Sequence, residues 1–196
     1  MKLKIKNDYS KILVCGLQGS GKTYFVKHLL NSKLWKKPIV YVVNKDDGYQ
    51  DITGIYTYTP KAPITEFKTF IKFVYNLIQE RKIDCLVIDE ADLFFSNNFE
   101  INSFDEFNDI ILNHRHFKLN IVLITRRPQD LPTKIVESCK HIYIFSLEGA
   151  NALKKFEDIQ KNLSLEIRKL DYNKHNFVYK EIAKTGYVCQ PIKSED

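Results

Sequence analysis

The sequence predicts an α/β fold in which helices cover both faces of one mostly parallel sheet. Short apolar runs recur along the chain without polar alternation, as expected of strands that are buried on both sides. Segments with apolar residues at three- and four-residue spacing separate these runs, which is the order that builds a parallel sheet. The 196 residues, 44% of them apolar, are enough for one domain with a sizeable core. We therefore expect a single domain over residues 1–196.

The first elements follow from the pattern of apolar residues. A strand is expected at Lys11–Cys15, where KILVC ends in a glycine turn, and a helix follows because Phe25 and Leu29 share one face. The run PIVYVVN (Pro38–Asn44) is β-branched and aromatic and predicts the second strand. A turn-rich stretch then leaves room for a short strand at Ile55–Thr59.

The middle of the chain continues the alternation. Apolar residues at helical spacing predict an amphipathic helix over Ile64–Gln79. Apolar runs predict further strands at Cys85–Asp89, Asn120–Thr125 and His141–Leu147. Between the first two of these strands, SFDE (Ser103–Glu106) has the form of a capping box ahead of a helical pattern.

The C-terminal part is expected to extend a core of about residues 11–147. Residues 148–170 are helical in pattern and rich in lysine. Two short strands around Lys184-Thr185-Gly186 predict a hairpin, so that the extension runs to about residue 192.

The stretch GLQGSGKT predicts a phosphate-binding loop between the first strand and the first helix. Its glycines let the backbone turn tightly and direct N–H groups at phosphate oxygens, and the helix adds the positive end of its dipole. Lys22 is expected to reach the β- and γ-phosphates, and the Thr23 hydroxyl to bind Mg²⁺. The residues expected to bind the nucleotide are Gly16, Leu17, Gln18, Gly19, Ser20, Gly21, Lys22, Thr23 and Tyr24.

Two adjacent carboxylates follow the apolar run CLVI. Asp89 has the position of the Mg²⁺-binding aspartate of P-loop enzymes, and Glu90 is placed to activate a water for attack on the γ-phosphate. Because a kinase does not need that water, the pair favours hydrolysis. The alternative is that both carboxylates cap the following segment, and a local cap is the better explanation for Asp92.

Basic residues flank the strand at Asn120–Thr125. Arg126 and Arg127 follow it at the edge where open α/β sheets bind ligands, and are candidates to sense the γ-phosphate or to contact DNA. The alternative is that they are solvated arginines in a loop. Arg115 precedes the strand, at the end away from its own nucleotide, and is a candidate arginine finger for a neighbouring subunit. A surface position at a helix end explains Arg115 equally well.

Composition leaves the partner open. A net charge of +6 permits a polyanionic partner, and a solvated basic surface explains it equally well, because the lysines are spread along the chain. No run approaches the roughly 20 apolar residues of a membrane span, and the N-terminus lacks the apolar region of a secretory signal.

The motifs GLQGSGKT, CLVIDEAD and RHFKLNIVLITRRPQDLP, in this order, resemble the HerA/FtsK superfamily of DNA-pumping ATPases. Within it the chain looks most like the short genome-packaging ATPases of tailless dsDNA viruses, including archaeal ones. The resemblance covers about residues 11–147, and the strand that ends in a TQRP-like motif is its most specific part. It departs at Arg126, where the family usually has glutamine, so that it does not assign the sensor.

The resemblance implies a RecA-like ASCE P-loop fold, with the Asn120–Thr125 strand between the phosphate-loop strand and the Asp89 strand. It also implies hydrolysis of ATP with Mg²⁺, translocation of double-stranded DNA, and a ring, commonly a hexamer, in which Arg115 acts in trans. A capsid or portal-vertex protein is then a further partner, and the cytoplasm of the host cell or the virion the location.

Three alternatives stay open. The size and the loop also suit a nucleoside or nucleotide kinase, with Arg126 and Arg127 as lid arginines. A DNA-translocating ATPase of a plasmid or integrated element would carry the same motifs. A nucleotide-dependent switch is the third, and Glu90 argues against it.

Overall fold

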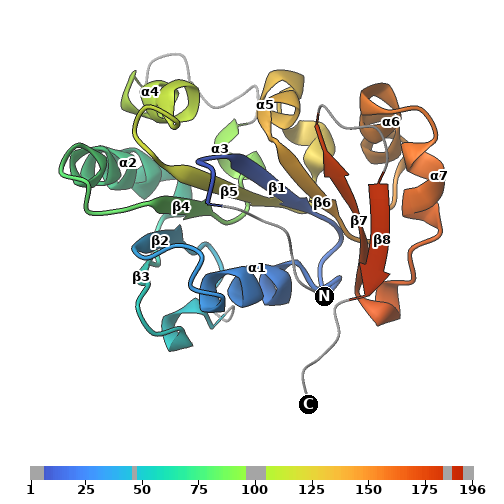
Figure 1. Cartoon of the computed structure of the whole chain (residues 1–196), viewed down its shortest axis with the longest axis horizontal. Coiled ribbons are helices and arrows are strands. Elements are labelled where there is room, and N and C mark those ends of the chain that lie inside the picture. Colours follow the sequence, from blue (N-terminus) through green and yellow to red (C-terminus); the bar gives the residue numbers. More distant parts are fainter. Residues whose placement is uncertain (1–6, 46–47, 96–104, 183–186, 192–196) are drawn as a thin grey trace.

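The protein, seen in a computed structural model that describes residues 7–45, 48–95, 105–182 and 187–191, is built on one eight-stranded sheet of order β3-β2-β4-β5-β1-β6-β7-β8 (Figure 1). The first six strands are parallel, and β7 and β8 are antiparallel additions at one edge. The strands are β1 (Lys11–Cys15), β2 (Pro38–Tyr41), β3 (Tyr56–Tyr58), β4 (Cys85–Ile88), β5 (Asn120–Thr125), β6 (His141–Ile144), β7 (Asn176–Glu181) and β8 (Tyr187–Pro191). The predicted mostly parallel sheet and the C-terminal hairpin are confirmed.

Strand β5 lies between β1 and β4, as the resemblance implied. Cys15 at the end of β1 is level with Thr125 at the end of β5, and Ile88 at the end of β4 is level with Leu123. The segments that follow these three strands therefore emerge side by side at one edge of the sheet. This strand order confirms the RecA-like ASCE fold.

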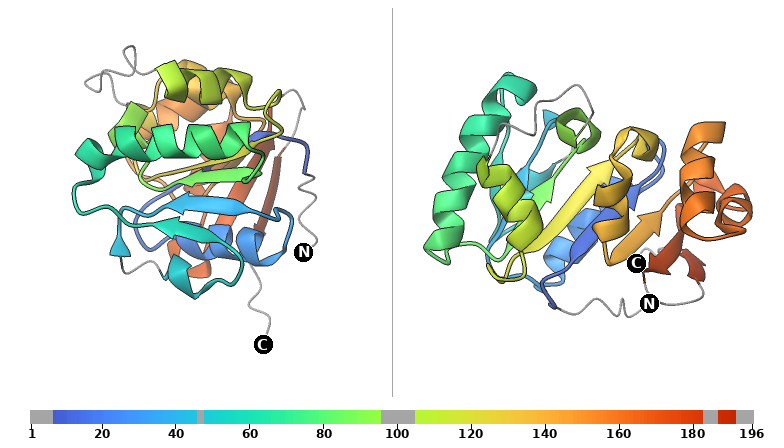
Figure 2. Two further views of the ribbon diagram at one scale, coloured as in Figure 1. Left: turned by 90° about the vertical axis from the view of Figure 1, so that its left-hand side faces the viewer. Right: turned by 90° about the horizontal axis from the view of Figure 1, so that it is seen from above.

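Helices cover the two faces unequally. Figure 2 shows α1 on one face and α2 and α4 on the other, and the apolar side chains form one cluster on each side. The helices are α1 (Lys22–Asn31), α2 (Pro63–Gln79), α3 (Asp92–Phe95), α4 (Asp105–Asn113), α5 (Thr133–Ser138), α6 (Ala150–Ile159) and α7 (Leu163–Arg168), with short 3₁₀ turns η2 (Tyr49–Asp51), η4 (Pro128–Asp130) and η5 (Tyr172–Lys174). None of the helices in the described residues is long and apolar enough to cross a membrane.

Several elements differ in extent from the prediction. Strand β2 ends at Tyr41 instead of Asn44, and β6 ends at Ile144 instead of Leu147, because the regular pairing of β2 with β4 and of β6 with β1 stops at those residues. The helical stretch 148–170 is divided in two at Asn162, which has a left-handed backbone (φ 67°). The predicted capping box at Ser103 begins outside the described residues.

The larger apolar cluster contains a set of contacting aromatic rings, and its stability contribution is testable. Replacing Phe67 with alanine should lower the free energy of unfolding by about 3–5 kcal/mol, because it removes a ring and leaves a cavity. Phe67 is fully buried, and its ring lies 3.9 Å from that of Phe94 and 5.1 Å from that of Phe107. Urea denaturation measures the change.

Helix α2, which contains Phe67, also contains the residue for a control substitution. Phe73 is 55% exposed, so that Phe73→Ala should change the unfolding free energy by less than about 0.5 kcal/mol. Equal losses in the two variants would show that the stacked rings do not carry the stability of α2.

Candidate active site

The phosphate loop, residues 16–21, joins β1 to α1 and is anchored to strands on both sides. The Gly16 N–H donates to the Thr125 carbonyl at 3.3 Å, and the Leu17 N–H donates to the Ser146 carbonyl at 2.8 Å. Gly21, directly before α1, has φ 103°, a conformation that side chains rarely allow. The loop thus places the N-terminus of a ten-residue helix at the end of β1, where its N–H groups favour an anion.

Two residues of this loop and helix offer an ammonium and a hydroxyl group to a phosphate. Lys22 is buried, and its ammonium donates to the Leu17 carbonyl at 2.7 Å, inside the curve of its own loop. Burial lowers the pKa of Lys22, and the Glu90 carboxylate partly opposes this. The buried Ser20 hydroxyl has no hydrogen-bond partner among the described residues. These donors fit the oxygens of a polyphosphate.

The two carboxylates after β4 lie in different surroundings. Asp89 is 3% exposed, and its backbone N–H donates to the Tyr41 carbonyl at 3.1 Å. Glu90 has a left-handed backbone (φ 48°), and its carboxylate lies 2.5 Å from the Arg126 guanidinium. Burial raises the pKa of Glu90, whereas the positive charges of Arg126 and Lys22 lower it.

Asp92 has a structural contact. It begins α3, and its carboxylate accepts a hydrogen bond from the Thr125 hydroxyl at 2.5 Å. The same hydroxyl accepts from the Arg127 N–H at 2.9 Å. Asp92 therefore ties the turn after β4 to the end of β5, which is more than the local cap we expected.

The structure separates the two arginines that the sequence treats alike. Arg126 bridges two parts of the site, because its guanidinium donates to the Gln18 side chain at 2.9 Å and pairs with Glu90. Arg127 is 66% exposed, and its guanidinium pairs with Asp130 at 2.8 Å.

One cavity of about 670 Å³ unites the site. It brings together predicted residues from the loop, from the end of β4 and from the end of β5, and adds two that the sequence did not indicate, Asn44 and His175. The residues that line it are Gln18, Gly19, Gly21, Lys22, Thr23, Tyr24, Asn44, Glu90, Arg126 and His175. Asn44 follows β2 at the carboxyl edge of the sheet. Because open α/β sheets bind ligands at this edge, the sequence could have indicated Asn44. His175 follows a turn near the C-terminus, and no sequence pattern marks it.

Arg115 does not join this cavity. It is exposed in the turn between α4 and β5, before the strand begins. Because the cavity lies beyond the other end of the six-residue strand, about 20 Å of strand separates the two positions.

The oxygens of Thr23 and Asp89 fit a magnesium ion. Thr23 lines the cavity and the buried Asp89 directly precedes Glu90. Mg²⁺ prefers carboxylate and hydroxyl oxygens to nitrogen or sulfur ligands.

Comparison with known proteins places this site in a family. Residues 6–130, more than half of the chain, match the family described as AAA domain. The match includes the phosphate loop, Glu90 and Arg126.

Solved structures share the fold. The genome packaging NTPase B204 from Sulfolobus turreted icosahedral virus 2 in complex with ATP-gammaS has a TM-score of 0.78 at 17% identity, over 95% of this chain and 100% of that chain. The structure of the same NTPase in complex with sulfate has a TM-score of 0.80 at 18% identity, over 97% of this chain and 100% of that chain. EssC (ATPases 2 and 3) from Geobacillus thermodenitrificans has a TM-score of 0.69 at 12% identity, over 97% of this chain and 41% of that chain.

A shorter similarity links the chain to a curated viral protein. The "Putative thymidylate kinase" of Acidianus bottle-shaped virus (isolate Italy/Pozzuoli) is 31% identical over 68 residues, which are 35% of this chain and 39% of that protein. The chain thus spans about two fifths of the length of this relative. The family match is longer and contains every residue that lines the cavity except His175, and on it we conclude that the chain belongs to the AAA domain family and is a P-loop ATPase.

Proposed function

We propose that this ATPase is a motor that moves double-stranded DNA, and that it packages a viral genome into a preformed capsid. The observation that carries the proposal is a cavity lined by the Glu90 carboxylate, on a fold that matches a genome packaging NTPase over the whole length of that chain. A transferase has no use for an activated water, whereas a motor must hydrolyse ATP in every cycle.

Each side chain of the cavity then has a role. Lys22 neutralises the β- and γ-phosphates, and Glu90 accepts a proton from the attacking water. Thr23 and Asp89 hold the Mg²⁺ ion, which when bound supplies positive charge that stabilises the phosphate oxygens. Arg126, already in the cavity, is the better candidate for the γ-phosphate sensor, because Arg127 points to Asp130.

Arg126 also sets the protonation of Glu90, which gives a pH prediction. Removing its charge with Arg126→Gln should raise the pKa of Glu90, because burial already raises that pKa and the arginine opposes it. Glu90 must be ionised to accept a proton, so the acid limb of the pH–rate profile for hydrolysis should move to higher pH. Arg127→Gln is the control, and an equal shift in both variants would contradict the role of the 2.5 Å ion pair.

The motor is proposed to work as a ring, commonly a hexamer, in which Arg115 of one subunit completes the site of the next. The exposed position of Arg115, at the opposite end of β5 from its own cavity, supports this arrangement. Charge stabilisation by a neighbour would couple hydrolysis to assembly.

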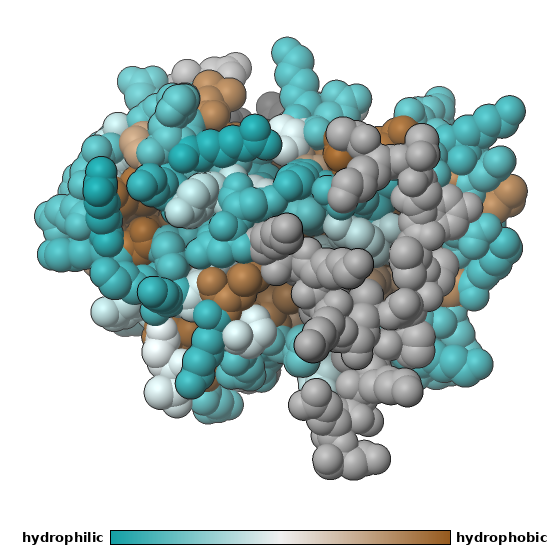
Figure 3. Space-filling model, viewed as in Figure 1, coloured by the Kyte–Doolittle hydropathy of each residue, from teal (hydrophilic) through white to brown (hydrophobic). Residues whose placement is uncertain are grey.

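Lysines of residues 148–170 are candidates to contact DNA, but they are not equivalent. Lys155 donates to the Leu131 carbonyl, and burial lowers its pKa. Lys154 and Lys161 are exposed and are the better candidates. Figure 3 shows that the described residues on the face in view are largely hydrophilic, with smaller apolar areas between them.

Phosphate release from ATP tests the function. The rate for the purified protein should rise when double-stranded DNA is added and when protein concentration is raised. Transfer of the γ-phosphate to a nucleoside or nucleotide acceptor would overturn the motor in favour of a kinase, the activity named for the viral relative. A capsid-protein gene beside this one would support genome packaging over DNA translocation for a plasmid or integrated element.

A further inference from the structure

A segment near the C-terminus, residues 171–176, lies against the outer side of the phosphate loop. The Tyr172 hydroxyl donates to the Gln18 carbonyl at 2.7 Å, across 154 positions of sequence. A Cβ atom on Gly19 would collide with the Tyr172 hydroxyl, and one on Gly21 would lie 3.1 Å from the His175 Cβ. The absence of a side chain at Gly19 and Gly21 therefore lets the 171–176 segment pack against the loop, in addition to allowing the conformation of the loop.

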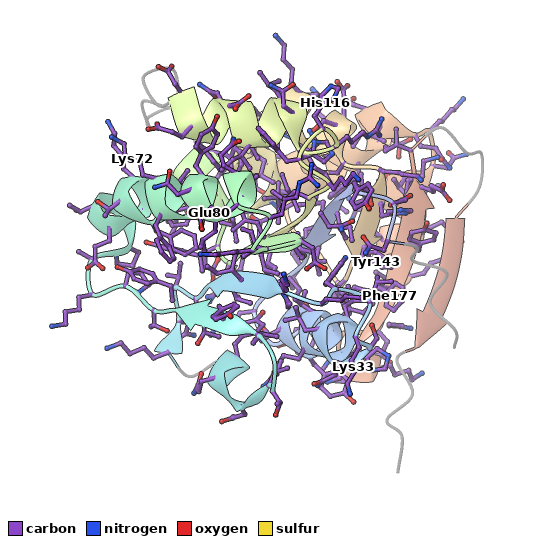
Figure 4. All side chains as sticks on the ribbon, turned by 60° about the vertical axis from the view of Figure 1, so that its left-hand side comes forward. Lys33, Lys72, Glu80, His116, Tyr143 and Phe177 are labelled. Atoms are coloured by element: carbon purple, nitrogen blue, oxygen red, sulfur yellow. The ribbon has the colours of Figure 1, made fainter. Side chains whose placement is uncertain are left out.

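The 171–176 segment has a fixed conformation. The Asp171 carboxylate accepts from the Asn173 N–H at 3.0 Å, and the Asp171 N–H donates to the Asn176 side chain at 3.2 Å. Phe177, the next residue, is buried, and its ring lies 5.3 Å from that of Phe25 and 5.6 Å from that of Tyr143 (Figure 4). His175 is thus held between an internally bonded turn and a buried aromatic anchor.

His175 itself is exposed and lines the nucleotide cavity. Its backbone is left-handed (φ 49°), which is unfavourable for a residue with a Cβ and is retained where the surroundings enforce it, often at ligand sites. The His175 N–H donates to the Tyr172 carbonyl at 3.4 Å and closes the turn η5, so the turn fixes the backbone from which the imidazole reaches the cavity wall.

The phosphate-directed groups occupy only part of the cavity. Lys22, Thr23, Glu90 and Arg126 serve the phosphates, while the volume of about 670 Å³ lies in the range of roughly 300–1,000 Å³ that whole small-molecule ligands need. A nucleobase has a flat π-face, and histidine is one of the side chains on which bases stack.

We propose that His175 is the residue on which the base of the bound nucleoside triphosphate stacks, so that the 171–176 segment completes the nucleotide site from near the end of the chain. The inference deepens the proposed function and rests on the same cavity. Because stacking is tolerant of base identity, it gives affinity more than discrimination between bases.

Dissociation constants for ATP and for inorganic tripolyphosphate test the assignment, measured by calorimetry with the whole chain. Tripolyphosphate fills the phosphate loop and has no base. His175→Ala should raise the dissociation constant of ATP about tenfold and leave that of tripolyphosphate unchanged. His175→Phe should restore the affinity for ATP, because phenylalanine also offers a π-face. Asn173→Ala is the matched control, since only the backbone of Asn173 makes a hydrogen bond in the turn, and it should change neither constant.

Two results would overturn the proposal. If His175→Ala leaves the affinity for ATP unchanged, the base lies elsewhere. If it weakens ATP and tripolyphosphate equally, His175 only supports the shape of the phosphate loop. Both binding constants are measured without DNA and with EDTA in place of Mg²⁺, so that ATP is not hydrolysed. A protein that fails to respond to DNA would therefore overturn the motor and leave this inference standing.

Discussion

Replacing Glu90 with glutamine is expected to slow ATP hydrolysis by about two to four orders of magnitude while ATP still binds. Glutamine keeps the size of the side chain but cannot take a proton from water. The phosphate-directed groups Lys22 and Thr23 remain, so the affinity for ATP should stay close to that of the unchanged protein. Single-turnover phosphate release measures the rate, and equilibrium binding of a fluorescent ATP analogue measures the affinity.

An exposed carboxylate serves as the control for the Glu90 variant. Glu80 pairs with Lys82 on the surface at 2.6 Å, and Glu80→Gln should leave the rate unchanged. Near-normal hydrolysis by the Glu90→Gln protein would refute Glu90 as the base and would favour the alternative that Glu90 caps the segment after β4. Loss of ATP binding together with hydrolysis would show that the carboxylate, or its ion pair with Arg126, holds the cavity open.

Replacing Arg115 with alanine is expected to lower the hydrolysis rate of the assembled protein by about three to five orders of magnitude, the range known for arginine fingers. The exposed side chain makes no contact with its own cavity, so ATP binding and thermal stability should change little. His116 is exposed in the same turn, at the edge of the molecule labelled in Figure 4, and His116→Ala should keep its activity.

Mixing two inactive proteins distinguishes a trans role from an indirect one. A subunit with Arg115→Ala keeps its own Glu90, and a neighbouring subunit with Glu90→Gln keeps its own Arg115. If the arginine acts across the boundary, mixed assemblies contain some complete sites, and part of the activity returns. No recovery at any mixing ratio would leave Arg115 as a surface residue at a helix end.

Local sequence predicts the elements and much of the cavity. Apolar periodicity marks the strands and the helices α1 and α2 because burial of one face or of both is a local property of the pattern. The phosphate loop is similarly local, since its glycines, Lys22 and Thr23 are neighbours in the chain. Glu90 and Arg126 are predicted to approach it because parallel strands bring their carboxyl ends to one edge.

What the sequence leaves undecided depends on contacts between distant segments. The sequence gives no reason to prefer Arg126 over Arg127, and the preference comes from the Gln18 side chain, 108 positions away. The ends of β2 and β6 depend on where their pairing with β4 and β1 stops, which the two strands themselves do not encode.

By itself the sequence determined the fold class, the phosphate loop and the carboxylate pair, because each rests on residues that are adjacent or regularly spaced. Only the tertiary structure decided that Arg126 pairs with Glu90, that Asp92 holds Thr125, and that His175 lines the cavity. The physical reason is that side-chain contacts depend on which strands become neighbours in the sheet. That order is set by the packing of the whole core and by no single stretch of the chain.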